Sequence, residues 1–266
     1  MPLDEKAARL SSILQSYSRV ALAFSGGVDS SVLLKCALNS LGAGNVLVLF
    51  GKSELLKPEE IARVENWPAD NGYPQGIDRE TITIQPLSWK EFVTNDAERC
   101  YFCKLRLYSL FQERMRKRGY STLVDGTNID DLKSKRAGLR AIHELDVKMP
   151  LVEAGLDKTD IRHLAKRLGL SQWDQPSASC LATRIPTGLA ITPERLLQIE
   201  EWENWLEQYG FSGCRVRLDK KLEDIAYLEI ESPDFEKLVN PSNRLTLLRY
   251  FKKKGVRKIF LDMEGR

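Results

Sequence analysis

A continuous apolar stretch that leads into a glycine turn constrains the fold of this chain more than any other sequence feature. Residues 19–24 (RVALAF) show no alternation of apolar and polar side chains, which predicts a strand buried on both faces, as in a parallel sheet. We expect residues 25–31 (SGGVDSS) to turn and open a helix, and residues 45–50 to form a second apolar strand. The sequence therefore predicts a β-α-β unit near the start of the chain.

Strands and helices continue to alternate downstream. We expect helices at residues 4–17, 58–72, 102–118 and 158–168, and strands at residues 80–85 and 121–125. This order predicts an α/β fold with a doubly wound parallel sheet in a first domain, residues 1–188. The segment 171–188 has no periodicity, and because loops longer than about 12–15 residues tend to be functional, we expect a site lid or a linker there.

The remaining residues, 189–266, predict a smaller α+β domain. We expect helices at residues 192–209 and 241–253, and strands at residues 214–218, 225–231 and 256–261. We expect this domain to bind substrate phosphate and to mediate assembly into a homo-oligomer.

Composition excludes several classes of protein. The chain has 40 Lys and Arg against 37 Asp and Glu, a net charge of +3, and 42% hydrophobic residues, which excludes the collagen-like, coiled-coil and disordered classes. No apolar run approaches the roughly 20 residues that span a membrane, and the first residues lack the layout of a signal peptide. Five cysteines, an odd number, suit a reducing compartment, and we expect Cys36 and Cys214 to be structural. We therefore expect a cytoplasmic protein with no membrane partner.

The segment 25–31 predicts a phosphate-binding loop. Its two adjacent glycines allow a tight turn that exposes backbone N–H groups at the positive end of a helix, and Ser25, Ser30 and Ser31 add hydroxyl donors. The loop lacks the lysine and the spacing of a Walker A motif, and residues 51–53 (GKS) lack the glycine that this motif requires five positions earlier. These differences argue against the kinase and GTPase classes. A glycine turn that only joins a strand to a helix is the alternative.

Three cysteines predict a metal centre. Cys100 and Cys103 form a CxxC motif, whose spacing lets two thiolates face one metal, and Cys180 follows much later in the chain. Three cysteines can hold a [4Fe–4S] cluster and leave one iron without a protein ligand, open to an exogenous sulfide or to substrate. The alternatives are a Cys₃His zinc site with His143 or His163, and a redox dithiol with Cys180 in the core.

Two arginines of the second domain, Arg215 and Arg217, occupy alternate positions of a predicted strand. Alternate residues face the same side, so their guanidinium groups can clamp a phosphate, and Thr183 and Arg184 can complete that pocket. The alternative is a pair of exposed arginines on a solvated sheet face. A basic run at residues 252–254 suits a solvated helix end better than an RNA site, so we expect no nucleic-acid partner.

Together these motifs resemble a known family. SGGxDS is similar to the pyrophosphatase loop (PP-loop) of the ATP-α-hydrolase superfamily. Further segments resemble its LarE family of ATP-dependent sulfur transferases over nearly the whole chain: Ser53-Glu54-Leu55, Asp125-Gly126-Thr127-Asn128, Ser179-Cys180, Thr183-Arg184-Ile185-Pro186 and Arg215-Val216-Arg217. The resemblance implies a PP-loop domain in which Asp29 helps to hold Mg²⁺. It also implies that the following residues bind ATP: Ala23, Phe24, Ser25, Gly26, Gly27, Asp29, Ser30, Ser53 and Gly126.

The resemblance also implies a reaction. Members of the LarE family adenylylate a carboxylate of pyridinium-3,5-biscarboxylic acid mononucleotide and replace AMP with sulfur, in nickel-pincer nucleotide biosynthesis. In one branch the cysteine at the position of Cys180 gives up its own sulfur, and in the other three cysteines bind a [4Fe–4S] cluster that delivers a sulfide. The CxxC motif indicates the second branch, with a separate sulfide donor and with Cys100, Cys103, Cys180 and Asp29 as catalytic residues.

The resemblance assigns two further sets of residues in the second domain. Thr183, Arg184, Arg215 and Arg217 would bind the substrate phosphate, and Glu203, Glu229 and Asp234 would bind a metal ion or the pyridinium ring. Three alternative functions stay open: a [4Fe–4S]-dependent tRNA thiolation enzyme, a zinc-stabilised amide-forming synthetase, and a nucleotide-sensing module without turnover.

Overall fold

The computed structural model describes residues 1–73, 75–133, 137–175 and 179–266. Its contacts divide the chain into two compact units, and each unit combines two segments. The first unit contains Met1–Pro86 and Glu98–Ser177, and the second contains Leu87–Ala97 and Ala178–Arg266. These ranges differ from the predicted domains 1–188 and 189–266, because residues 87–97 and 179–188 make their contacts with the second unit.

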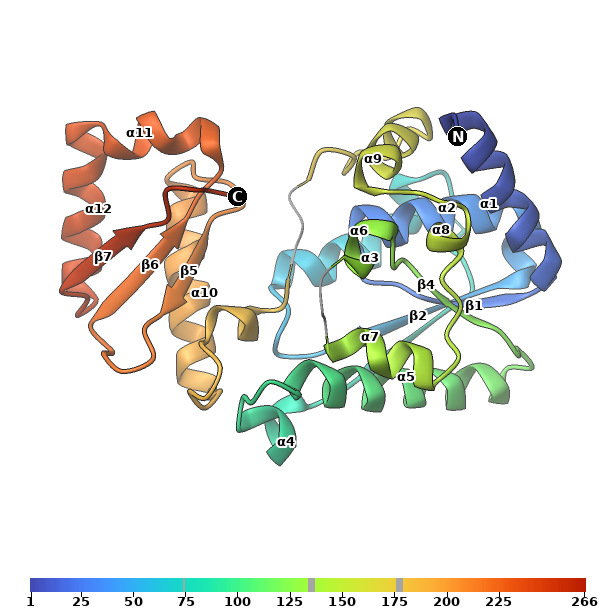
Figure 1. Cartoon of the computed structure of the whole chain (residues 1–266), viewed down its shortest axis with the longest axis horizontal. Helices are drawn as coiled ribbons and strands as arrows, with labels where there is room; N and C mark the ends of the chain where they lie inside the picture. Colours follow the sequence, from blue (N-terminus) through green and yellow to red (C-terminus); the bar gives the residue numbers. More distant parts are fainter. Residues whose placement is uncertain (74, 134–136, 176–178) are drawn as a thin grey trace. The chain divides into compact units, whose positions relative to one another are not determined.

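The first unit is built on a parallel four-stranded sheet in the order β3-β2-β1-β4 (Figure 1). Its strands are β1 (Val20–Ala23), β2 (Val46–Lys52), β3 (Arg79–Thr83) and β4 (Leu123–Asp125). All four residues of β1 are buried, as the continuous apolar stretch predicts. The chain runs outward from β1 through β2 to β3 and then returns to the other side of β1, so the strand order reverses at β1 and β4. Ligands of such sheets bind at the carboxyl ends of the strands at this reversal.

Helices cover both faces of this sheet (Figure 1). One layer contains α1 (Leu3–Tyr17), α2 (Val28–Leu41) and α9 (Lys158–Arg167), and the other contains α5 (Arg99–Lys117) and α7 (Ala137–Glu144). The unit also contains α3 (Pro58–Asp70), α6 (Ile129–Leu132) and α8 (Pro150–Glu153). The predicted doubly wound α/β fold is therefore confirmed.

The second unit is a smaller α+β structure. Its three strands, β5 (Arg215–Leu218), β6 (Ile225–Glu229) and β7 (Lys258–Leu261), form a sheet in which β5 and β6 are antiparallel and β6 and β7 are parallel. Its helices are α4 (Lys90–Val93), α10 (Pro193–Gln208), α11 (Phe235–Val239) and α12 (Pro241–Lys253). The Thr192 hydroxyl caps α10 by accepting from the Arg195 amide, as expected at a helix start.

A core of aromatic and aliphatic side chains holds this unit together. Trp202 of α10 and Phe251 of α12 are fully buried, with ring centroids 5.4 Å apart. Cys214 is also buried, as the sequence predicts. Across the described parts of both units, no helix combines the length and the apolar character that a membrane crossing requires.

Candidate functional site

The loop between β1 and α2 has the tight geometry expected of a phosphate cradle. Gly26 has a φ of +75°, and a β-carbon added there would lie 2.7 Å from Cγ2 of Val64, so only glycine fits. The hydroxyls of Ser25 and Ser30 lie 3.1 Å apart, and the Ser30 hydroxyl donates to the Gly27 carbonyl over 3.1 Å. The tight turn that the sequence predicts before α2 is therefore present, and phosphate binding by this loop stays a prediction.

Gly126, directly after β4, lies against the start of α2. A β-carbon at Gly126 would lie 2.9 Å from the Ser30 amide nitrogen and 3.1 Å from the Ser30 Cα. The register pairs Ala23 with Asp125, so the ends of β1 and β4 are adjacent. Ala23 and Gly126 therefore border the loop of residues 25–31 at the strand-order reversal, and their contact with ATP stays a prediction.

Asp29 is held beside this loop by the segment that follows β4. Nδ2 of Asn128 donates to an Asp29 carboxylate oxygen over 3.2 Å, and the Asn128 side chain also caps α6. Burial and the neighbouring Asp131 carboxylate raise the pKa of Asp29 to about 6. A carboxylate in this setting gains from a nearby cation, which suits the predicted role with Mg²⁺.

Three other residues that the sequence predicts at this site, Phe24, Ser31 and Ser53, make side-chain contacts within the protein. The Phe24 side chain points into the core, where its ring meets that of Trp67 at 5.7 Å, so only its backbone borders the loop. The Ser31 hydroxyl is fully buried and accepts from Trp67 and Gln172, so the expectation that it donates to phosphate is wrong. Ser53 follows β2, where its hydroxyl accepts from the Leu55 amide over 3.3 Å.

The CxxC motif lies in the first two turns of α5. Cys100 is exposed and Cys103 is half-buried, and Nη2 of Arg99 lies 3.8 Å from the Cys100 sulfur. Neither thiol is enclosed in the core, so both are accessible to a metal ion or to a reactant. The motif thus has the setting of a reactive or metal-binding pair and not that of a core pair.

Asp125 connects this helix to the phosphate-loop edge of the sheet. Its buried carboxylate accepts from the Tyr108 hydroxyl over 3.0 Å and lies 4.0 Å from Nζ of Lys104, the residue after Cys103. Burial and Asp125 hold the pKa of Tyr108 well above its ordinary value, so this hydroxyl stays protonated as a donor. Because Gly126 touches Ser30, the CxxC helix and the phosphate loop are joined through Asp125 and Gly126.

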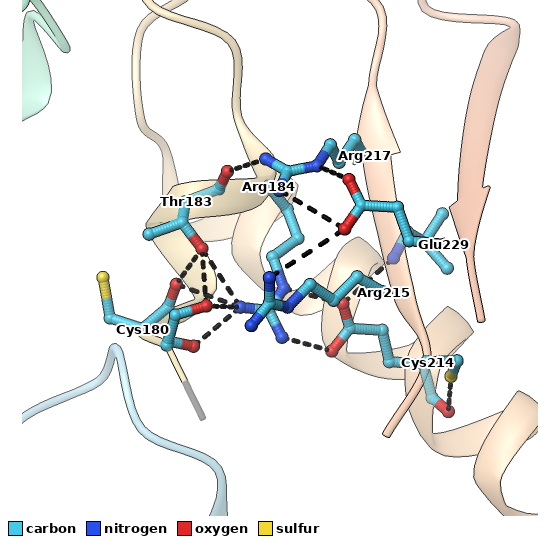
Figure 2. A network of polar contacts seen from close by, with 10 residues as sticks. Cys180, Thr183, Arg184, Cys214, Arg215, Arg217 and Glu229 are labelled. Atoms are coloured by element: carbon cyan, nitrogen blue, oxygen red, sulfur yellow. Dashed lines mark hydrogen bonds and ion pairs between the residues drawn. The ribbon is translucent and has the colours of Figure 1, made fainter. Parts of the chain in front are cut away.

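In the second unit, Cys180 begins a short 3₁₀ helix, Leu181–Arg184. The Thr183 hydroxyl donates to the Cys180 carbonyl over 2.9 Å and lies 3.0 Å from the Ser179 hydroxyl (Figure 2). The preceding residues of the predicted loop, 176–178, lie outside the described residues. The turn at 179–184 therefore presents Cys180 on a backbone fixed by local hydrogen bonds.

Arg184 and Glu203 hold this turn in place through hydrogen bonds. Nε and Nη2 of Arg184 donate to the two carboxylate oxygens of Glu203 over 2.8 and 3.1 Å, and both side chains are buried. Nη1 of Arg184 donates to the Ser179 carbonyl over 2.6 Å, and Glu203 also accepts from the Val216 amide. The two side chains are thus paired with each other inside the unit, and their predicted contacts, of Arg184 with substrate phosphate and of Glu203 with a metal ion, stay predictions.

Arg215 and Arg217 lie on the same side of β5 and face one carboxylate, that of Glu229 on β6 (Figure 2). Nη1 of Arg217 also donates to the Thr183 carbonyl over 2.7 Å, so the pair adjoins the Cys180 turn. Burial and the nearby Arg266 and Arg184 lower the pKa of Arg215 to about 10. Two guanidinium groups on one side of the strand suit the predicted phosphate site, because each can donate charge-assisted hydrogen bonds to phosphate oxygens.

The structure does not bring the predicted metal ligands of the second unit together. Glu203 is paired with Arg184, Glu229 is paired with the two arginines, and Asp234 lies at the start of α11. Within the described residues, no group of three or more His, Cys, Asp or Glu side chains is arranged to hold a metal ion. Because Cys100 and Cys103 belong to the first unit and Cys180 to the second, the three-cysteine centre stays a prediction.

Sequence reasoning missed two buried amides that fix loops near these residues. Gln172 donates to Ser31 over 2.9 Å and anchors the segment after α9 to α2. Asn95 donates to three backbone carbonyls of the segment 185–189. Gln172 lies in the segment 171–188, whose lack of periodicity is the one signal that could have found it, and no sequence signal marks Asn95.

Comparison with known proteins covers both units. The chain is 31% identical over 263 residues, 99% of its length and 92% of the relative, to a pyridinium-3,5-bisthiocarboxylic acid mononucleotide synthase of Lactiplantibacillus plantarum. The chain belongs to the LarE family. No family model matches it.

Two further relatives are similar to the chain. An uncharacterized protein of Synechocystis sp. is 32% identical over 99% of the chain and 95% of its own length. A probable tRNA sulfurtransferase of Methanothermobacter thermautotrophicus is 25% identical over 71% of the chain and 50% of the relative. The LarE match includes the second unit, with the Cys180 turn and the arginine pair, as well as the PP-loop unit.

Proposed function

We propose that this LarE family member is an ATP-dependent sulfur transferase that converts a carboxylate of pyridinium-3,5-biscarboxylic acid mononucleotide into a thiocarboxylate. The observation that carries the proposal is the link between the CxxC helix and the phosphate loop through Asp125 and Gly126. The link supports the proposal because it joins the helix that carries Cys100 and Cys103 to the loop at which the adenylate would form. The name of the L. plantarum relative supports the same substrate class.

The phosphate loop would bind the β- and γ-phosphates of ATP. In this structure the Ser25 and Gly27 amides and the Ser30 hydroxyl make hydrogen bonds within the loop. When ATP binds, the backbone N–H groups of residues 25–27 and the Ser30 hydroxyl would donate to phosphate oxygens, and Asp29 would hold Mg²⁺. A substrate carboxylate oxygen then attacks the α-phosphorus, pyrophosphate leaves, and an acyl-adenylate forms. The loop assists chiefly by positioning the phosphates and by neutralising the charge on the departing pyrophosphate.

The arginine pair would bind the phosphate of the mononucleotide. Arg215 and Arg217 both lie beside Glu229 on one side of β5, and two guanidinium groups so placed could donate charge-assisted hydrogen bonds to one phosphate. Arg217 also touches the Thr183 carbonyl, three residues after Cys180. A substrate whose phosphate occupies this pair could therefore extend its ring toward the Cys180 turn.

The thiols of Cys100, Cys103 and Cys180 would ligate a [4Fe–4S] cluster. Three thiolates are the right donor type for three irons, and the exposed and half-buried positions of the cysteines permit ligation. When bound, the cluster would supply the sulfide that displaces AMP from the acyl-adenylate. A separate donor would then restore this sulfide, which permits repeated turnover without loss of the Cys180 sulfur.

The proposal is tested on protein purified without oxygen, with iron and acid-labile sulfide counted. Cys100→Ser, Cys103→Ser and Cys180→Ser should each lose the cluster and thiocarboxylate formation but keep substrate-dependent pyrophosphate release, because adenylylation does not need the thiols. Cys36→Ser and Cys214→Ser are the matched controls. Zinc without iron would indicate the synthetase alternative, and absence of pyrophosphate release would indicate a nucleotide sensor. Spent enzyme that has lost H₂S at Cys180 would establish the sacrificial route.

The match to a probable tRNA sulfurtransferase favours one second candidate, tRNA thiolation at the same loop. That function requires tight RNA binding that weakens steeply with salt, because phosphate contacts release counterions. A filter-binding titration of tRNA at two salt concentrations, with the mononucleotide as competitor, separates the two functions.

A further inference from the structure

Asn95 has a backbone and a side chain that are both unusual for its position. Its φ is 57°, in the left-handed region, and its side chain is fully buried. Ser18 and Asp146, the other non-glycine residues with positive φ among those the structure describes, are both exposed. Asn tolerates this conformation better than most residues, but burial of an amide requires hydrogen-bond partners.

The Asn95 amide finds its partners in the segment that follows the Cys180 turn. Nδ2 donates to the carbonyls of Ile185, Pro186 and Leu189 over 3.3, 2.9 and 2.7 Å. Two backbone hydrogen bonds reinforce the contact: the Gly188 amide donates to the Asn95 carbonyl over 2.8 Å, and the Ile191 amide donates to the Val93 carbonyl over 2.9 Å. We call these five hydrogen bonds the Asn95 clamp.

The clamp joins the two cysteine-bearing segments by a short path along the chain. Asn95 lies five residues before Cys100, and Ile185 lies five residues after Cys180. Five residues span at most about 18 Å even when fully extended. Because Glu98–Ser177 belongs to the folded first unit, the chain after α9 already connects Cys180 to that unit, and the clamp adds a second connection through Asn95. A segment held by two short connections has fewer accessible positions than a segment held by one.

We propose that Asn95 is a positioning residue for the three-cysteine site: its clamp raises the effective concentration of the Cys180 thiol near the CxxC thiols. The clamp acts through chain length and touches neither substrate nor cluster. This inference rests on the proposed function only in its assignment of the three cysteines to one centre.

The test uses the full-length, metal-free protein and a bifunctional thiol reagent, dibromobimane, with bridged peptides identified by mass. Asn95→Asp keeps the size and the left-handed tolerance but replaces the NH₂ donor with an oxygen that faces three carbonyls. Asn95→Gly keeps the positive φ and removes the side chain, which provides a second variant if the first fails to fold. Asn45→Asp is the matched control, since Asn45 makes a similar amide-to-carbonyl bond to Leu41 over 2.9 Å in the first unit.

We expect bridging of Cys180 to Cys100 or Cys103 to slow by about tenfold or more in folded Asn95 variants, a loss of effective concentration. The bridge between Cys100 and Cys103 within α5 serves as the internal standard and should form at the wild-type rate. Folded Asn95 variants that bridge Cys180 as fast as wild type would overturn the clamp proposal and leave the proposed function intact. A wild-type protein that never bridges Cys180 to the CxxC pair would overturn both.

Discussion

The Arg184 guanidinium group and the Glu203 carboxylate face each other through two hydrogen bonds in the interior of the second unit. Arg184 also donates to the Ser179 and Cys180 carbonyls, and Glu203 accepts from the Val216 amide between Arg215 and Arg217. One ion pair therefore fixes both the turn that carries Cys180 and the strand that carries the arginine pair.

Replacement of one partner of this ion pair should lower the free energy of unfolding more than replacement of both. Glu203→Gln leaves a buried guanidinium charge without its counter-charge, and we expect unfolding free energy to fall by about 3 kcal/mol in urea titrations. The double variant Arg184→Met with Glu203→Leu should recover much of that stability and stay inactive, because the Cys180 turn loses its donors. Asp224→Asn, which breaks the exposed ion pair with Arg257, is the control and should leave stability close to that of the wild type. A double variant no more stable than Glu203→Gln would contradict this account.

Gly126→Ala should abolish ATP binding. The added carbon would lie 2.9 Å from the Ser30 amide nitrogen, so the start of α2 must shift and the phosphate loop with it. Overpacking of this kind typically costs about 1–3 kcal/mol in stability. Gly44→Ala is the matched control, because no heavy atom lies within 4 Å of a β-carbon there. Calorimetric titration with ATP and Mg²⁺ measures the affinity for ATP. Wild-type affinity in Gly126→Ala would show that a β-carbon at this position does not displace the phosphate loop.

Binding of Mg²⁺ with ATP should weaken as the pH falls through about 6, where the metal competes with a proton on Asp29. Asp29→Asn should bind metal weakly at every pH and lose this dependence. Calorimetric titrations from pH 5 to pH 8 measure the midpoint, and a midpoint near pH 4 would show that Asp29 is not perturbed.

The raised pKa of Asp29 also predicts how the stability of the metal-free protein changes with pH. The folded-state pKa of Asp29 lies above its ordinary value of 3.8, so ionisation of Asp29 destabilises the fold at pH values above about 6. Asp29→Asn should therefore raise the Tm at pH 7.5, and the gain should shrink as the pH falls toward 4. A gain that grows at low pH would have the wrong sign for a raised pKa.

Arg215→Gln should weaken binding of the pyridinium mononucleotide and leave ATP binding unchanged. Charge-assisted hydrogen bonds contribute about 1.5–3 kcal/mol, which corresponds to a loss of about 10-fold to 150-fold in affinity. The dephosphorylated nucleoside should bind both proteins equally, since it lacks the group that the arginine recognises. Arg257→Gln, at an exposed ion pair of the same unit, is the control. Equal losses for nucleotide and nucleoside would place the phosphate elsewhere.

Regular elements were predictable where local signals and burial agree. The apolar strand at 19–24, the helix at 241–253 and the Thr192 cap appear in the structure within a few residues of prediction, because periodicity and capping are local properties. Gly126 was predictable only as part of a resemblance. Its physical reason, contact with Ser30, requires knowing that β4 lies beside β1.

Polar residues with buried partners were not predictable. Arg184, Glu203 and Ser31 have the sequence character of surface or ligand-binding residues, and only long-range packing reveals that each is satisfied within the protein. The assignment of residues 87–97 to the second unit has the same origin, because the hydrogen bonds of Asn95 reach residues about ninety positions later. No window of local sequence contains such information.

The segment Leu87–Ala97 is flanked on both sides by first-unit chain although it packs with the second unit. The two units are thus interleaved, and a single cut at residue 178 would strip the smaller one of α4 and of the Asn95 clamp. Anyone who transplants the smaller unit into another enzyme must carry two separate pieces of polypeptide. Recombination at one crossover point would produce chimaeras in which neither piece has its native neighbour.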